Sequence, residues 1–396
     1  MPWKESSVMD ERVRFIGRLL DGESMAGLCR EYGISRKTGY KFRDRYLAHG
    51  VRGLVDVSRR PQYHPHKTEE ATEKLIVRLR KIKPSWGPKK LRARLELDYP
   101  DIKIPSVSTI DAVLNRYGVA KHPTKHKRYR AQSTGPLHQS HAPNDIWCVD
   151  FKGQFRLRNG HYCYPLTITD HYSRFILECE ALESTATNGA WSSFERVFQY
   201  YGLPRRIRSD NGIPFSSRSM NGWSQLSVWW LRLGIELERI EPGHPEQNGR
   251  HERMHWTLKR EATRPASPGL FHQQARFDHF RHEFNCYRPH EALQMRTPSE
   301  LYVKSDRLYP AQLPQLDYPL HDMVRTVSKN GRVYLRKRTN INLSAALAGE
   351  EVGLKEIKPY LWQIDFITHS LGIFDETTKI FQQNQPVPPP AQLMKV

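Results

Sequence analysis

Three acidic residues in well-separated segments could act together on a phosphodiester. Asp150 ends an apolar run, Asp210 opens an Asp-Asn-Gly turn, and Glu252 follows a loop rich in proline and glycine. Carboxylate oxygens are the ligands that Mg²⁺ prefers, and a pair of such ions can promote in-line attack on phosphate. We therefore expect these three residues to be catalytic and to hold two Mg²⁺ (or Mn²⁺) ions. Asp150 would bridge both ions, Asp210 would bind one and Glu252 the other.

The same segment contains a competing pattern. Residues 251–255 read His-Glu-Arg-Met-His, which is the H-E-x-x-H signature of zinc metalloproteases. On a helix, His251 and His255 would lie on one side. The pattern is surrounded by arginine and lysine, however, and a metalloprotease would explain neither the charge of the chain nor its N-terminal pattern. Zinc proteolysis is therefore the weaker interpretation. A second alternative is a non-enzymatic DNA-binding regulator with a degenerate core.

The composition indicates a polyanionic partner. The chain of 396 residues has a formal net charge of +20, which favours binding to nucleic acid. Its five cysteines form no C-x-x-C pair, so neither a disulfide framework nor a thiolate zinc site is indicated. The first residues are charged, and no apolar run approaches the roughly 18 residues that cross a bilayer. We expect a cytoplasmic protein without a membrane partner, associated with the nucleoid when it binds double-stranded DNA.

The N-terminal region, residues 1–60, has the pattern of a helix-turn-helix. Asp10, Ser24 and Ser35 can cap three successive helices, and a short turn with Gly33 separates the last two. In such motifs the second helix enters the major groove with its N-terminus first. A small helical bundle with a solvated basic face is the alternative. The residues expected to contact DNA are Arg36, Lys37, Thr38, Lys41 and Arg45.

A second helical domain is expected at residues 61–120, in which Ser108 can open the last helix. It could be another helix-turn-helix or a dimerising or spacing unit. A linker at 121–142 follows, with a basic run that contains no acid up to residue 132. We expect this run to follow a phosphate backbone through Lys125, Lys127, Arg128 and Arg130.

From residue 143 the pattern changes to strands. Segments 146–157, 162–169 and 174–181 read as strands, with Asn159-Gly160 as a hairpin turn. Helices and strands then alternate, which predicts a mixed sheet flanked by helices over residues 143–305. Residues 318–382 predict a small β barrel with a hairpin turn at 329–331, and 383–396 a disordered tail rich in proline.

Several motifs in order resemble one family. They are W-x-x-D at 147–150, D-N-G at 210–212 and P-G-H-P-x-x-N-G-x-x-E-R-x-H-x-T-L-K at 242–259. N-C-Y-R-P-H at 285–290 and T-P at 297–298 follow, and L-C-R-E-Y-G-I-S-R at 28–36 precedes them. Together they resemble the bacterial insertion-sequence transposases of the DDE superfamily, which also contains the retroviral integrases.

The resemblance implies a multi-domain chain. It would have N-terminal all-α helix-turn-helix units, a central α/β core with the ribonuclease-H-like integrase fold, and a small C-terminal β barrel. It implies a metal-dependent polynucleotidyl transferase that binds transposon ends, cleaves the strands and joins them to target DNA in DNA recombination and integration. A homo-oligomer on DNA is implied, because two ends must be held together. Asn248 and Arg250, beside the catalytic helix, are expected to contact DNA.

Two glutamates compete for the third catalytic position. Counted from Asp210, Glu246 follows after 35 intervening residues, the spacing associated with the superfamily, and Glu252 after 41. The motif context favours Glu252, because the proline-rich loop and the Asn-Gly pair precede the acid in related enzymes. A helix also fixes the direction of a ligand better than a loop does. We therefore expect Glu252 to be the catalytic residue.

Overall fold

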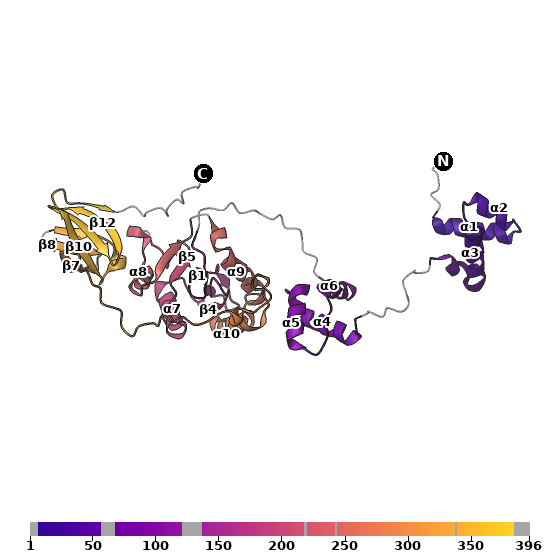
Figure 1. The fold of residues 1–396 in the computed structure, drawn as a ribbon, viewed down its shortest axis with the longest axis horizontal. Helices are drawn as coiled ribbons and strands as arrows, with labels where there is room; N and C mark the ends of the chain where they lie inside the picture. Colours follow the sequence, from indigo (N-terminus) through magenta and orange to yellow (C-terminus); the bar gives the residue numbers. More distant parts are fainter. Residues whose placement is uncertain are drawn as a thin grey trace. The chain divides into compact units, whose positions relative to one another are not determined.

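The computed structural model describes residues 7–56, 68–120, 137–217, 220–241, 244–336 and 339–383. It divides into two compact units, residues 1–69 and 70–396, and each is described by itself (Figure 1). The basic run at 121–132 and the tail from residue 384 lie outside the described residues. In the described part of the chain, no helix is both long and apolar enough to cross a membrane.

The first unit is a bundle of three helices, each of which begins after a serine. Ser7, Ser24 and Ser35 each accept a hydrogen bond from a backbone N–H in the first turn of the following helix. The expectation that Asp10 caps the first helix is wrong, because Asp10 lies in the first turn and its carboxylate accepts a hydrogen bond from the Ser7 N–H. The elements are α1 (Val8–Leu20), α2 (Met25–Glu31), α3 (Arg36–His49) and a 3-10 turn at Gly50–Leu54.

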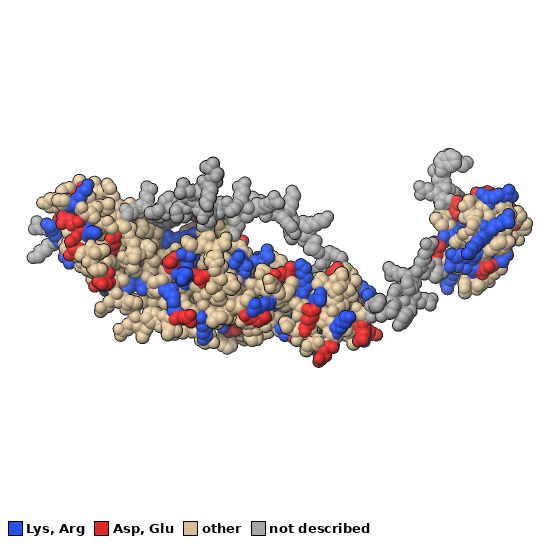
Figure 2. Space-filling view, viewed as in Figure 1, with Lys and Arg blue, Asp and Glu red and all other residues tan. Residues whose placement is uncertain are grey.

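Close backbone packing fixes the short helices of this unit. A Cβ on Gly39 would lie 2.6 Å from Met25 Sδ and 2.8 Å from Cys29 Sγ, so α3 approaches α2 where only glycine fits without rearrangement. Phe15, Leu28 and Phe42 are buried in the small core between the helices. The basic side of α3 is left facing solvent, and Lys and Arg side chains cover much of this unit in Figure 2.

The second helical region belongs to the larger unit. It consists of α4 (Glu70–Ile82), α5 (Pro88–Asp98) and α6 (Val107–Arg116). The N-cap of α6 is Ser106 rather than the expected Ser108, since Ser106 accepts the hydrogen bond from the Thr109 N–H.

These helices dock on the segment after α10 (Leu270–His282). Tyr287 is the centre of the contact: its hydroxyl donates to Asp98 at 3.1 Å, and its ring lies 5.7 Å from that of Trp86. Ser85 donates to Glu261 at 2.6 Å, and Lys83 pairs with Glu283.

A mixed sheet forms the centre of the larger unit. β1 pairs antiparallel with β3 and parallel with β5, which pairs parallel with β6; β2 and β4 both pair with β3. The expected strand at 146–157 is two strands, which pair with different stretches of β3. The bounds are β1 (Ile146–Phe151), β2 (Phe155–Arg156), β3 (Tyr162–Asp170), β4 (Ile176–Leu182), β5 (Arg206–Ser209) and β6 (Glu236–Arg239).

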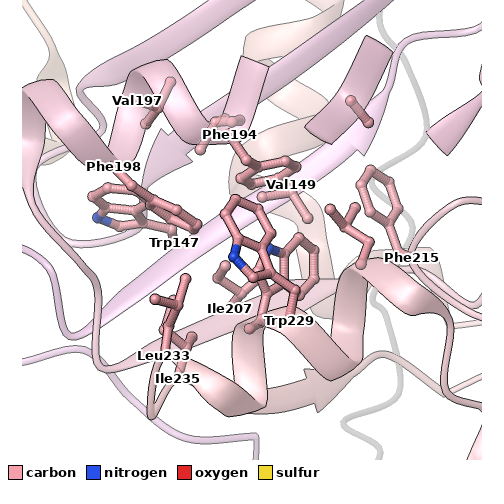
Figure 3. Close-up of a cluster of buried hydrophobic side chains, with 14 of the residues drawn as sticks. Trp147, Val149, Phe194, Val197, Phe198, Ile207, Phe215, Trp229, Leu233 and Ile235 are labelled. Carbon is pink, nitrogen blue, oxygen red and sulfur yellow. The ribbon is translucent and has the colours of Figure 1, made fainter. Parts of the chain in front are cut away.

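Helices cover both faces of this sheet. Trp147 and Val149 pack against α7 (Thr187–Tyr201) and α8 (Gln225–Arg232) in a core rich in aromatic rings, drawn in Figure 3. Successive strand residues point to opposite faces. Asp150 therefore faces α9 (Gly249–Glu261), which packs with α10 on the other side of the sheet.

The C-terminal region is a β structure, but no closed barrel is found. Its five-stranded antiparallel sheet has the order β13-β12-β11-β10-β7, and β8 and β9 form a separate pair. Residues 328–331 do form a tight turn, yet it joins β7 and β8, which belong to different sheets. Within the described residues the larger sheet stays open, and its apolar face packs on Val228 and Leu231 of α8. The strands are β7 (Met323–Thr326), β8 (Arg332–Arg336), β9 (Thr339–Asn342), β10 (Glu351–Lys358), β11 (Leu361–Phe366), β12 (His369–Asp375) and β13 (Ile380–Gln383).

Candidate active site

The three expected acids lie near one another at one edge of the central sheet, close enough for the charges of Asp210 and Glu252 to act on Asp150. Asp150 lies near the end of β1, and Asp210 directly follows β5. These strands are parallel neighbours, so their carboxyl ends lie side by side. Glu252 is in the first turn of α9, which crosses the face to which Asp150 points. A negative side chain in the first turn of a helix is also favoured by the helix dipole.

The Asp-Asn-Gly turn holds Asp210 in place. Its carboxylate accepts a hydrogen bond from the Gly212 N–H at 3.1 Å, and a Cβ at Gly212 would lie 2.9 Å from the same carboxylate. Asn211 donates to the carbonyl of Ile240 at 2.7 Å, which ties the turn to the segment after β6. The glycine and the asparagine thus have separate roles in fixing the direction of one acid.

The acids repel one another electrostatically. Burial, then the neighbouring carboxylates of Asp210 and Glu252, raise the pKa of Asp150 to about 7. Its side chain is 26% exposed. A partly buried carboxylate beside other carboxylates lacks the counter-charge that would stabilise its ionised form. The site is therefore suited to receive a cation.

Two buried histidines and two threonines lie behind Asp150. The threonines were not predicted as part of the site, and the histidines were considered only as zinc ligands. Thr167 on β3 is 2.7 Å from Nε2 of both His251 and His255, and its hydroxyl donates to the Asp150 carbonyl at 3.0 Å. Thr169 lies 2.8 Å from His251 Nδ1. Two signals were available: threonines two apart on a strand share one face, and histidines four apart on a helix share one side.

Counting protons fixes the state of both rings. A hydroxyl has one proton, and Thr167 gives it to the Asp150 carbonyl, so both histidines must donate to Thr167 through Nε2–H. Burial lowers the pKa of both rings, to about 3 for His251, so both are neutral. His255 Nδ1 is therefore an unprotonated nitrogen, 3.6 Å from Asp150 Oδ2. Two acceptors that face each other in this way leave room for a proton or a cation between them.

This geometry counts against the zinc metalloprotease interpretation. Both ring nitrogens of His251 are hydrogen-bonded to threonines, whereas a zinc ligand needs a free nitrogen. Asp150, His251 and His255 do place ligand atoms within 4.8 Å of one another, but the acid in that group comes from β1. Glu252, the acid of the motif, is exposed on the helix.

Asp170 has a structural role. Its carboxylate accepts hydrogen bonds from the Ser173 N–H and hydroxyl, at 2.7 and 2.6 Å, and from the Asn144 N–H at 2.8 Å. These bonds organise the turn that follows β3.

The residues expected to contact DNA lie in several places. On α3, Arg36, Lys37 and Lys41 are exposed, whereas Thr38 and Arg45 are half-buried. Asn248 is buried before α9, while Arg250 donates to the His171 carbonyl at 3.1 Å. The basic residues expected to follow the phosphate backbone, Lys125, Lys127, Arg128 and Arg130, lie outside the described residues.

Known families match two parts of the chain. The Integrase core domain family matches residues 140–245, and a second family of the same description matches 233–298. A Helix-turn-helix domain family matches residues 11–62, and a Homeodomain-like domain family matches 38–114. The family matches to the core contain Asp150, Asp210 and Glu252.

Relatives include proteins of bacterial insertion elements. An uncharacterized 31.7 kDa protein of insertion element IS407 from Burkholderia multivorans is 27% identical over 164 residues, 41% of this chain and 57% of that protein. A 39.2 kDa protein of IS476 from Xanthomonas euvesicatoria is 25% identical over 62% of this chain and 70% of its own length. The Gag-Pol polyprotein of baboon endogenous virus is 28% identical over 45% of this chain, but over only 10% of its own length.

Similar solved structures are viral integrases. The HTLV-2 integrase catalytic core in complex with magnesium is 15% identical, with a TM-score of 0.34 over 42% of this chain and all of that one. A simian T-cell lymphotropic virus intasome chain is 16% identical, with a TM-score of 0.37 over 74% of this chain and 97% of that one.

Proposed function

We propose that this chain is a bacterial insertion-sequence transposase of the retroviral-integrase-like superfamily. It would bind the ends of a mobile DNA element, cleave strands there and join them to target DNA. One observation supports this most strongly. Three acids from β1, the turn after β5 and α9 lie near one another, and partial burial, then the charges of Asp210 and Glu252, raise the pKa of Asp150.

The donor set fits a divalent metal. Asp150, Asp210 and Glu252 would hold two Mg²⁺ or Mn²⁺ ions, because these hard cations prefer carboxylate oxygens and would remove the mutual repulsion of the acids. When bound, such ions activate an attacking oxygen and stabilise the leaving oxygen of a phosphodiester.

The protein itself supplies direction and rigidity. β1 and α9 fix Asp150 and Glu252 on regular elements, and the Gly212 N–H orients Asp210. Thr167 joins the Asp150 carbonyl to both histidines of α9, so the strand and the helix keep a constant separation. Positioning of this kind reduces the entropy that the reaction must lose.

We assign end recognition to domain 1–60 and strand chemistry to 143–305. The helical domain 61–120 and the linker 121–142 connect the two, and 318–382 forms a further DNA-binding or assembly unit. The active form would be a homo-oligomer, because two ends must be cut together.

The direct test is cleavage of a duplex that carries one end of the element. We expect nicking with Mg²⁺ or Mn²⁺, none in EDTA, and no stoichiometric zinc in the purified protein. Asp210→Asn should lose at least 100-fold in cleavage rate while it still binds the duplex. A wild-type protein that binds the end but never cuts it would instead support the DNA-binding regulator.

A further inference from the structure

A cavity lies on the α9 side of the sheet. It has a volume of about 680 Å³, in the range of ligand-binding sites, and is lined by α5, β1, β3, the first half of α9 and the segment after α10. Asp150, Asp210 and Glu252 are not among its lining residues. It is thus separate from the carboxylate cluster, although His251 forms part of its wall.

The lining of this cavity is strongly cationic. Five basic side chains contribute to it: Lys90, Arg174, Arg250, Arg253 and Arg288. The two carboxyl groups in the lining are already engaged. Asp170 is held by Asn144 and Ser173, and Glu291 pairs with Lys89 at 3.2 Å.

Much of this positive charge is uncompensated. Among the described residues, no carboxylate pairs with Lys90, Arg174 or Arg253. Arg174 Nε and His290 Nε2 are buried without a hydrogen-bond partner. Burial, and then Arg288, lower the pKa of Lys90 to about 8, while burial and Arg250 lower that of Arg174 to about 10. Crowded cations with unused donors favour an anion between them.

One side of the cavity is apolar and aromatic. Trp256 is 57% exposed and lines the cavity together with the buried Met254 and Phe284. The Arg260 guanidinium lies over its ring, 4.4 Å from the centroid. An exposed indole beside a cationic site offers a stacking surface for a nucleic-acid base. A phosphate and a base attached to one another match this pair of surfaces better than an inorganic ion does.

We infer that this cavity binds a nucleotide unit, with its phosphate among Lys90, Arg174 and Arg253 and its base against Trp256. The same chemistry has two sources: a nucleotide within a DNA strand, or a free nucleotide. That the nucleotide belongs to a DNA strand rests on the proposed function. That the cavity binds a nucleotide through its phosphate and base does not.

Calorimetric titration of the full chain in EDTA tests the inference apart from metal-dependent cleavage. Thymidine 5′-monophosphate should bind at least 10-fold more tightly than thymidine. Lys90→Gln and Arg253→Gln should each weaken this binding at least 5-fold. Arg92→Gln is the matched control: it removes one charge from the same helix, at an exposed site paired with Glu96, and should change the affinity less than 2-fold.

Two further comparisons show whether the bound nucleotide belongs to a DNA strand and whether the cavity binds it independently of the carboxylate cluster. A single-stranded oligonucleotide that binds at least 10-fold more tightly than the monophosphate, with the same loss in Lys90→Gln, identifies a DNA strand; equal or weaker binding identifies a free nucleotide. Glu252→Gln should leave binding of the monophosphate unchanged even when cleavage is lost. The inference is overturned if thymidine and its monophosphate bind equally, or if Arg92→Gln weakens binding as much as Lys90→Gln and Arg253→Gln do.

Discussion

At the scale of residues, the surroundings of Asp150 determine what the site can do. Its carboxylate faces an unprotonated histidine nitrogen, and its carbonyl accepts from Thr167. Burial, and then the charges of Asp210 and Glu252, raise its pKa to about 7. Such an arrangement is poorly stabilised without a cation. The site has the character of an active site, where local stability is reduced in favour of binding.

The repulsion predicts a pH-dependent effect of Asp150→Asn on stability. The pKa of Asp150 is raised from 3.8 to about 7, so the folded state favours the protonated acid, and this stabilisation is lost as the pH rises through about 7. In EDTA, Asp150→Asn should therefore raise the melting temperature by several degrees at pH 8 and by less than half as much at pH 5. The corresponding gain in the free energy of unfolding is at most about 4 kcal/mol at pH 8. Asp101→Asn, at an exposed site, is the control, and an equal effect at both pH values would contradict the prediction.

The choice between the two glutamates gives a second prediction at this scale. Glu252 lies on α9 and raises the pKa of Asp150, whereas Glu246 belongs to the 3-10 turn Pro245–Asn248 before the helix. Glu252→Gln should abolish cleavage and strand joining without loss of end binding. Glu246→Gln should retain substantial activity. The reverse result in a cleavage assay would show that the spacing from Asp210 was the better guide.

At the scale of elements, short sequence patterns predicted the features that residues close together in the chain determine. The apolar run of β1, the serine caps Ser24 and Ser35, and the turn after β5 follow from a few neighbouring residues. The partners of Asp150 do not, because Thr167 and His255 meet it only through sheet register and helix packing. The small β barrel is not confirmed for the same reason: strand texture is local, but closure depends on which edges pair.

Close packing in the first unit gives a prediction at this scale. A Cβ on Gly53 would overlap the backbone carbonyl of Arg45 at the end of α3, and backbone cannot move aside as a side chain can. Gly53→Ala should thus destabilise this unit by about 1–3 kcal/mol, seen as faster hydrogen exchange of the α3 amides in the full chain. Gly17→Ala is the matched control, since its Cβ meets nothing within 4 Å on α1. It should preserve or slow that exchange, and equally fast exchange in both variants would rule out the steric explanation.

At the scale of the whole molecule, the net charge of +20 is distributed over elements with different tasks. The exposed face of α3 offers Arg36, Lys37 and Lys41, while the cavity beside α9 concentrates further cations away from the carboxylates. Contacts to phosphate bring affinity without sequence information, whereas contacts to base edges bring specificity. The same excess charge can therefore support both recognition of an end and binding of unrelated target DNA.

This division predicts how salt acts on the full chain. The affinity for end DNA should fall steeply with salt, with a log–log slope of about −0.9 for each neutralised phosphate. Lys37→Ala should weaken binding to the end more than binding to random duplex, because Lys37 is near the N-terminus of the helix expected to enter the major groove. Lys304→Ala is a control outside the first unit, since this lysine lies over the Tyr200 ring at 3.6 Å. Fluorescence anisotropy at several salt concentrations would measure both slope and preference. A flat salt response, or equal loss on both duplexes in Lys37→Ala, would contradict the assignment of end recognition to α3.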